Sequence, residues 1–72
     1  MDFNDQRILL GKRIADARKR QGLTQKQLAL MAGLNHGYLS EVENGTGNIS
    51  INKLFALADA LDVPAASLLA ED

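Results

Sequence analysis

The chain has 72 residues, a formal net charge of −1 and 46% apolar residues, with one Pro and no Cys. This length is that of one small domain, here residues 1–72, and the lack of Cys excludes a disulfide framework or a thiolate metal site. The residues after Met1 lack the long apolar run of a signal peptide or membrane span, so we expect a cytoplasmic protein with no membrane partner. Apolar residues that are chiefly Leu, Ala and Ile favour an all-α fold.

Charge is distributed unevenly along the chain. Up to Leu28 there are seven basic and three acidic side chains, a net charge of +4, whereas from Ala29 onward there are one basic and six acidic side chains, a net charge of −5. A negative total disfavours phosphate binding, but a polarised molecule can still present a basic face to nucleic acid. The alternative is that the basic run 18–20 is an ordinary solvated helix end.

The first predicted helix spans residues 4–21. Four apolar residues at near-helical spacing predict its buried face: Ile8, Leu10, Ile14 and Ala17. Gly22 follows, and we expect it to end the helix in the left-handed conformation.

A second helix is predicted to begin after Thr24, because Thr24 and Gln27 have the spacing of a capping box. Its buried residues are expected to be Leu28, Ala29 and Ala32. Gly33 suits a sharp turn, since glycine readily adopts a positive φ. Asn35 is then the expected N-cap of a third helix over residues 36–43, with Leu39 and Val42 facing inward.

A polar loop over residues 44–49 leads to Ser50, the expected N-cap of a fourth helix over residues 51–61. The core face of this helix is predicted from Leu54, Leu57, Ala58 and Leu61. Pro64 interrupts the chain and suits the first turn of a short fifth helix that carries Leu68 and Leu69. The residues after Ala70 are expected to be frayed.

The segment of residues 24–43 is the most informative part of the chain. Two short helices joined by a three-residue turn that contains Gly pack at an angle, and the second helix then projects its outer face. The DNA major groove is wide enough to admit a helix presented in this way. The pattern therefore indicates a helix-turn-helix.

The sequence resembles the lambda-repressor-like helix-turn-helix family, also called the xenobiotic-response-element family, from about Leu10 to Leu69. The resemblance is carried by Leu10-Gly11-Lys12-Arg13-Ile14, Gly22-Leu23-Thr24-Gln25, Leu28-Ala29, Ala32-Gly33-Leu34, Tyr38-Leu39-Ser40, Glu43-Asn44-Gly45, Asn48-Ile49-Ser50-Ile51, Leu54, Leu61-Asp62-Val63-Pro64 and Leu68-Leu69. Ile49 stands where the family often has Pro, and Asp62 where it usually has Gly. The resemblance implies a compact five-helix domain that binds double-stranded DNA without a cofactor, associated with the nucleoid.

The resemblance also implies which residues read bases. These are the outward residues at the start and middle of the third helix: Asn35, His36, Gly37 and Glu41. Glu41 could accept from the exocyclic amine of cytosine and His36 could pair with guanine, whereas Gly37 allows close approach of the helix. Because these residues would make few direct base contacts, we expect DNA shape and deformability to provide part of the sequence specificity.

The resemblance also implies that a second set of residues contacts the sugar-phosphate backbone of DNA: Arg18, Gln25, Tyr38, Ser40, Asn44, Thr46 and Asn48. Gln25 would contact a phosphate and brace the third helix. Arg18 and Glu43 stand where the family commonly has a salt bridge, which could either orient Arg18 toward a phosphate or serve as a structural brace alone.

Apolar residues of the fourth and fifth helices predict a homodimer interface formed by Phe55, Ala65, Ala66 and Leu69. In relatives these helices often build a two-fold dimer that presents two recognition helices on one face of the duplex. The alternative is that Phe55 only closes the core of its own domain.

The sequence therefore predicts a dimeric repressor, or a controller protein of a restriction-modification system, that reads a pseudo-palindromic operator through the third helix. A second hypothesis is a helix-turn-helix interaction module or antitoxin whose main partner is a protein. This hypothesis is supported by Gly37, Glu41 and the net negative charge. The sequence shows no catalytic grouping, so it does not predict an enzyme. His36, the sole histidine, has no acidic or Cys neighbours at metal-ligand spacing, so no metal site is predicted.

Overall fold

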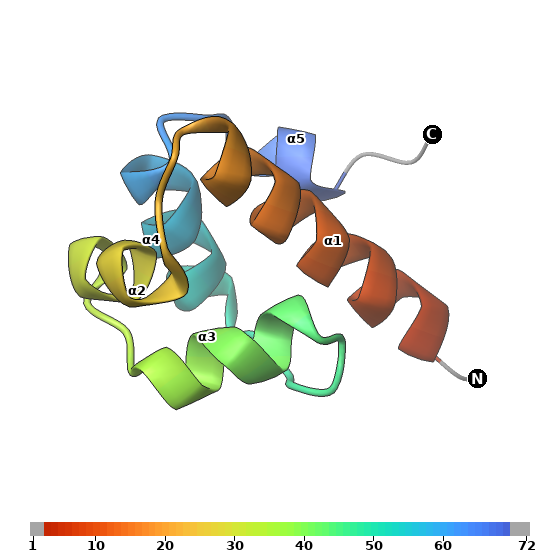
Figure 1. The fold of residues 1–72 in the computed structure, drawn as a ribbon. Coiled ribbons are helices and arrows are strands. Elements are labelled where there is room, and N and C mark those ends of the chain that lie inside the picture. The colour runs from red at the N-terminus through yellow and green to blue at the C-terminus, as the bar shows by residue number, and fades with distance from the viewer. Residues whose placement is uncertain (1–2, 70–72) are drawn as a thin grey trace.

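The computed structural model describes residues 3–69, and this part of the chain contains five α-helices and no strand (Figure 1). They are α1 (Asn4–Arg20), α2 (Gln25–Ala32), α3 (His36–Glu43), α4 (Ile51–Ala60) and α5 (Ala65–Leu69). The expected all-α five-helix fold is confirmed, whereas the fraying expected after Ala70 lies outside the described residues. None of the helices within residues 3–69 has the length and apolar character needed to cross a membrane.

The helix boundaries follow from local sequence signals. The capping box at the start of α2 is present, since the Thr24 hydroxyl accepts from the backbone N–H of Gln27 and the Gln27 side chain accepts from that of Thr24. Gly33 ends α2 at φ 70°, a conformation that costs glycine little and that turns the chain sharply toward α3. The predicted first and fourth helices were each one residue too long, because Gln21 and Leu61 are C-cap residues.

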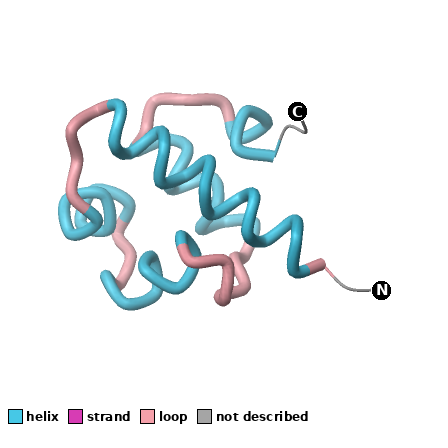
Figure 2. The backbone as a smooth tube through the Cα atoms, turned by 45° about the vertical axis from the view of Figure 1, so that its right-hand side comes forward, coloured by secondary structure: helices cyan, strands magenta, loops and turns pink. Residues whose placement is uncertain are grey.

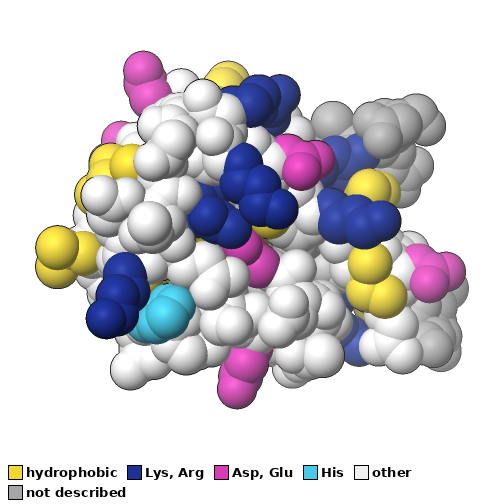
Figure 3. Space-filling view, viewed as in Figure 1, with side chains coloured by type: hydrophobic (Ala, Val, Ile, Leu, Met, Phe, Trp, Pro, Cys, Tyr) yellow, Lys and Arg dark blue, Asp and Glu magenta, His cyan; other side chains and the backbone are white. Residues whose placement is uncertain are grey.

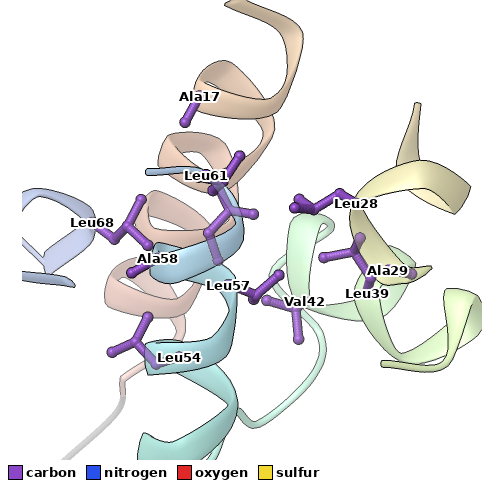
Figure 4. Close-up of a cluster of buried hydrophobic side chains, with 11 residues drawn as sticks. Ala17, Leu28, Ala29, Leu39, Val42, Leu54, Leu57, Ala58, Leu61 and Leu68 are labelled. Atoms are coloured by element: carbon purple, nitrogen blue, oxygen red, sulfur yellow. The ribbon is translucent and has the colours of Figure 1, made fainter. Parts of the chain in front are cut away.

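The core is a single cluster to which all five helices contribute (Figure 4). It consists of Ile14, Ala17, Leu28, Ala29, Leu39, Val42, Leu54, Leu57, Ala58, Leu61 and Leu68. The long helix α1 packs against α3 and α5, and α4 packs against α2 and α5 (Figures 1 and 2). The short helices α2 and α3 pack against each other, and both contribute side chains to this core. Close packing of these side chains fixes the orientation of α2 relative to α3.

Ile8 does not belong to this core, contrary to the prediction from its spacing. Its side chain is 45% exposed, although Ile14 and Ala17 on the same helix are buried. Ile8 instead lies against Gly45 in the loop after α3, where an added Cβ would come within 2.7 Å of Ile8 Cγ1. The helical spacing was correct, but at this end α1 is covered by a loop and not by another helix.

Gly11 allows α1 to approach α3 unusually closely. A Cβ at this position would lie 2.4 Å from the carbonyl oxygen of Val42 and 2.6 Å from that of Glu43. Both are backbone atoms at the end of α3 and cannot rotate away. The contact therefore requires glycine. It also sets the distance between α1 and α3 that the side chain of Arg18, further along α1, spans to reach Glu43.

Candidate nucleic-acid interface

The outer face of α3 consists of small and polar residues. Leu39 and Val42 are buried beneath the helix, whereas His36, Gly37 and Glu41 are exposed. Gly37 and Glu41 are four positions apart and therefore share one stripe of the helix surface. Three of the four predicted base-reading residues thus lie together on the face directed away from the core.

Asn35, the fourth predicted base-reading residue, is the N-cap of α3. Its Oδ1 accepts from the backbone N–H groups of Gly37 at 2.7 Å and Tyr38 at 3.3 Å. The side-chain oxygen is therefore committed to the helix, and only the amide N–H groups could interact with DNA.

Arg18 and Glu43 form an ion pair with two parallel hydrogen bonds. Arg18 donates from Nε to Glu43 Oε2 at 2.8 Å and from Nη2 to Oε1 at 2.9 Å, and its Nη1 donates to the carbonyl oxygen of Leu23 at 2.9 Å. The side chains are only 12% and 4% exposed. Because all three nitrogens of the guanidinium are engaged, Arg18 braces α1 against α3, and little of it is accessible to a phosphate.

Gln25 extends this pair toward the start of α3. Its Nε2 donates to Glu43 Oε1 at 3.0 Å, and its Oε1 lies 3.2 Å from Nε2 of His36. Gln25 therefore joins the end of α3 to its beginning, and its carboxamide has partners on both sides. We call the four side chains of Arg18, Glu43, Gln25 and His36 the polar relay.

Tyr38 fixes the loop that follows α3. Its hydroxyl donates to the carbonyl oxygen of Asn48 at 3.1 Å, and Nζ of Lys53 lies 4.3 Å from the centre of its ring. A hydroxyl proton used in this way is not free for a phosphate, so a backbone contact by Tyr38 would require this bond to break. Lys53, which the sequence reasoning did not select, is held beside the loop by the cation–π contact.

The loop of residues 44–48 is folded back onto α3. The carbonyl oxygen of Glu41 accepts from the backbone N–H groups of Thr46 at 3.0 Å and Gly47 at 3.2 Å, and from the Thr46 hydroxyl at 3.3 Å. Asn44 and Asn48 are exposed on this loop, and Ser40 is half-buried on α3. The loop is thus tied to α3 through both Glu41 and Tyr38.

A groove at the polar relay brings in two further basic residues, Lys12 and Lys19, that were not among the predicted site residues. Its lining residues are Lys12, Ala15, Asp16, Arg18, Lys19, Gln25, Glu43 and Asn44. Lys and Arg side chains gather over α1 on the corresponding face of the molecule (Figure 3). Lys12 and Lys19 are exposed and seven positions apart, so they share one side of α1. That spacing was the signal in the sequence that could have identified them.

The predicted dimer residues lie on the neighbouring helices α4 and α5. Phe55 and Leu69 are each 53% exposed, Ala66 is exposed, and Ala65 is half-buried against the core. Phe55 therefore does not close the core, which removes the alternative interpretation of this residue. Ile51, one helical turn before Phe55, is 57% exposed and adds to the apolar face, although the sequence reasoning did not select it.

No group of three or more His, Asp or Glu side chains within residues 3–69 is arranged to hold a metal ion. The candidate interface instead offers hydrogen-bonding groups on α3, the short helix that follows the turn at Gly33, and positive charge on α1. Together with the five-helix core, it defines the class of protein as a lambda-repressor-like helix-turn-helix protein.

The sequence pattern of the helix-turn-helix family HTH_3 matches residues 14–68, and the chain belongs to this family. It is a helix-turn-helix transcriptional regulator and not an enzyme. The control protein C.BamHI of Bacillus amyloliquefaciens is 31% identical over 67 residues, which cover 92% of this chain and 83% of the relative.

Two solved structures show the same fold at higher sequence identity. The restriction-modification controller protein C.AhdI of Aeromonas hydrophila matches with a TM-score of 0.83 and 36% identity, over 85% of this chain and 92% of its own. The biofilm master regulator SinR, known from Bacillus subtilis, was solved in complex with DNA. It matches with a TM-score of 0.80 and 39% identity, over 85% of this chain and 98% of its own.

Proposed function

We propose that the chain is a dimeric, sequence-specific DNA-binding protein that regulates transcription, as a repressor or controller protein, by reading a pseudo-palindromic operator with α3. The observation that carries this proposal is the polar relay. It holds both ends of α3 against α1 and α2 while the stripe of Gly37 and Glu41 stays exposed. A rigid helix with a free outer face suits base reading in the major groove.

Phosphate contacts in this proposal come from the surroundings of α3. The backbone N–H groups at the start of α2 carry the positive end of the helix dipole, and Lys12 and Lys19 supply charge from the adjoining groove. Asn44 and Asn48 would donate to the backbone from the loop after α3. These contacts fix the register of α3 without reading sequence.

The dimer would form through the exposed apolar face of α4 and α5. Ile51, Phe55, Ala66 and Leu69 expose apolar surface there, which a second copy would remove from water. A two-fold dimer presents two copies of α3 about 34 Å apart, one helical turn of DNA, which requires a pseudo-palindromic operator. The similarity to C.BamHI and C.AhdI supports the controller role.

Selection from random duplex DNA, followed by affinity measurements over a salt series, tests this proposal. We expect an enriched two-fold-symmetric site, and affinity that falls steeply with salt.

Lys19→Ala should lower the magnitude of the slope of log affinity against log salt concentration by about 1, without changing the sequence preference. Glu41→Ala should instead relax selectivity at one base pair per half-site, worth about 1–3 kcal/mol. Asp59→Ala, which changes an exposed residue of α4, should alter neither the salt slope nor the selectivity. Failure to enrich any sequence would contradict the proposal.

A protein partner is the second candidate function, and one observation favours it. Leu30 is 82% exposed and Met31 54% exposed on α2, so two large apolar side chains on that helix are uncovered. Such a pair suits contact with another protein. Loss of a co-purified partner on Leu30→Ser, with DNA affinity unchanged, would support this role.

A further inference from the structure

The four side chains of the polar relay form a chain in which each hydrogen bond fixes the polarity of the next. The chain begins at Glu43, whose carboxylate is 4% exposed and accepts two bonds from Arg18. A carboxylate paired with a guanidinium in this way is ionised, so both of its oxygens can only accept. Any further group that bonds to Glu43 must therefore donate.

The orientation of the Gln25 carboxamide follows from this requirement. The Gln25 atom 3.0 Å from Glu43 Oε1 has to be the NH₂ nitrogen, since a carbonyl oxygen would face another acceptor. The amide oxygen is consequently turned to the other side, toward His36. The Gln25 oxygen can only accept, so the ring nitrogen 3.2 Å away has to carry the proton.

We propose that the polar relay holds His36 in the tautomer protonated at Nε2 and leaves Nδ1 as a hydrogen-bond acceptor for a DNA base. A neutral imidazole carries one N–H, so a proton fixed at Nε2 leaves Nδ1 with a free lone pair. His36 is exposed, and the structure gives Nδ1 no partner among residues 3–69. Gln25 and Glu43 are positioning residues in this scheme, and His36 makes the contact.

This inference rests on the proposed DNA-binding function and changes the base expected opposite His36. An acceptor pairs with the exocyclic amine of adenine or cytosine, whereas the major-groove edge of guanine offers only the acceptors N7 and O6. The neutral ring would therefore select adenine or cytosine, not the guanine expected from the residue type alone.

The tautomer can be measured in the free protein, without DNA. Because the chain has one histidine, long-range ¹H–¹⁵N spectra of the imidazole need no assignment. At alkaline pH, where an ordinary imidazole is neutral, we expect one protonated nitrogen, Nε2, with a detectable N–H proton and widely separated ¹⁵N shifts. Gln25→Ala should move both shifts toward those of a freely exchanging imidazole and abolish the N–H proton signal. Gln6→Ala, which changes an exposed Gln on α1, should leave the spectrum unaltered.

A wild-type spectrum already averaged between tautomers, or one insensitive to Gln25→Ala, overturns the relay whether or not the protein binds DNA. The base preference is tested separately, by selecting duplexes with the wild type and with His36→Lys, which can only donate. We expect adenine or cytosine opposite residue 36 in the wild type and guanine with His36→Lys. Guanine enriched by the wild type at alkaline pH overturns the acceptor role. Failure of both proteins to enrich any site overturns the proposed function, while the ring spectra still decide the tautomer.

Discussion

Glu43 is the residue that joins Arg18 and Gln25 in the candidate interface. Its carboxylate accepts hydrogen bonds from Arg18 and Gln25, and it is almost completely buried. Taking a carboxylate out of water is costly unless its partners stay in place, so the pair is most sensitive to the loss of one member.

Arg18→Ala should therefore destabilise the fold by about 3 kcal/mol, because it leaves a buried carboxylate without its counter-charge. Arg18→Lys should recover only part of this loss, since one ammonium cannot make the two parallel bonds to Glu43 and also reach the Leu23 carbonyl. Urea unfolding measures both values. The control is Arg20→Ala, an exposed residue in the same helix turn, which should change stability by less than about 0.5 kcal/mol. Equal stability of Arg18→Ala and Arg20→Ala would contradict the brace.

Asp62 occupies a position that suits glycine. Its φ is 55°, the left-handed region in which a Cβ is unfavourable, and it stands where the family usually has Gly. We expect Asp62→Gly to raise stability by about 0.5–1 kcal/mol, or roughly 2–8 °C in Tm for a domain of this size. Asp62→Asn removes the same charge and keeps a side chain that tolerates this conformation, so it should change Tm less, whereas Asp62→Ala should lower it. A lower Tm for Asp62→Gly would show that backbone strain is not the governing factor.

At the scale of elements, the crossing of α1 and α3 determines the position of α3, the proposed recognition helix. Gly11→Ala would drive a Cβ into two backbone carbonyls, which should cost about 1–3 kcal/mol and displace α3 from α1. Gly37→Ala is the matched control, because its Cβ would meet only the Asn35 side chain, at 3.1 Å.

The two glycines should then separate stability from binding. We expect thermal unfolding to show Gly11→Ala destabilised and Gly37→Ala close to wild type, because alanine favours a helix and the contact with Asn35 offsets part of that gain. DNA affinity should fall in both, in Gly37→Ala because the methyl group holds α3 away from the base edges. A Gly37→Ala protein that binds the selected site as tightly as the wild type would contradict close approach at this residue.

The helices themselves could be predicted from the sequence because their signals are local. Thr24 and Gln27 carry a capping box, and Gly33 marks a turn that only a few residue types tolerate. The polar relay could not be predicted in full. The bond between Gln25 and His36 depends on how closely α2 and α3 pack, which no local pattern records. The same holds for Gly11, whose sequence position inside a helix gives no sign of the carbonyls it contacts.

At the scale of the whole molecule, the basic side chains beside the relay and the apolar side chains of the proposed dimer face are exposed on different helices. The basic residues Lys12 and Lys19 on α1 adjoin the relay and the end of α3, whereas α4 supplies the exposed apolar residues Ile51 and Phe55. Two functions can therefore occupy different surfaces of a very small protein, with DNA on one and a second copy on the other.

The proposed dimer is tested by placing charge on its apolar face. Phe55→Glu should shift sedimentation equilibrium from dimer to monomer and weaken binding to a full operator by at least tenfold, while half-site binding is retained. Leu30→Glu introduces the same carboxylate at a still more exposed apolar position on α2 and should leave the dimer intact. Dimers that persist in Phe55→Glu would exclude this face as the interface.

The most direct test of the account is amide chemical-shift mapping of the protein titrated with a duplex obtained by selection. We predict that the largest changes fall on residues 36–41 of α3, with smaller ones at the start of α2 and in the loop of residues 44–48. Changes confined to α4 and α5, or changes identical with a scrambled duplex, would contradict the claim that α3 reads DNA.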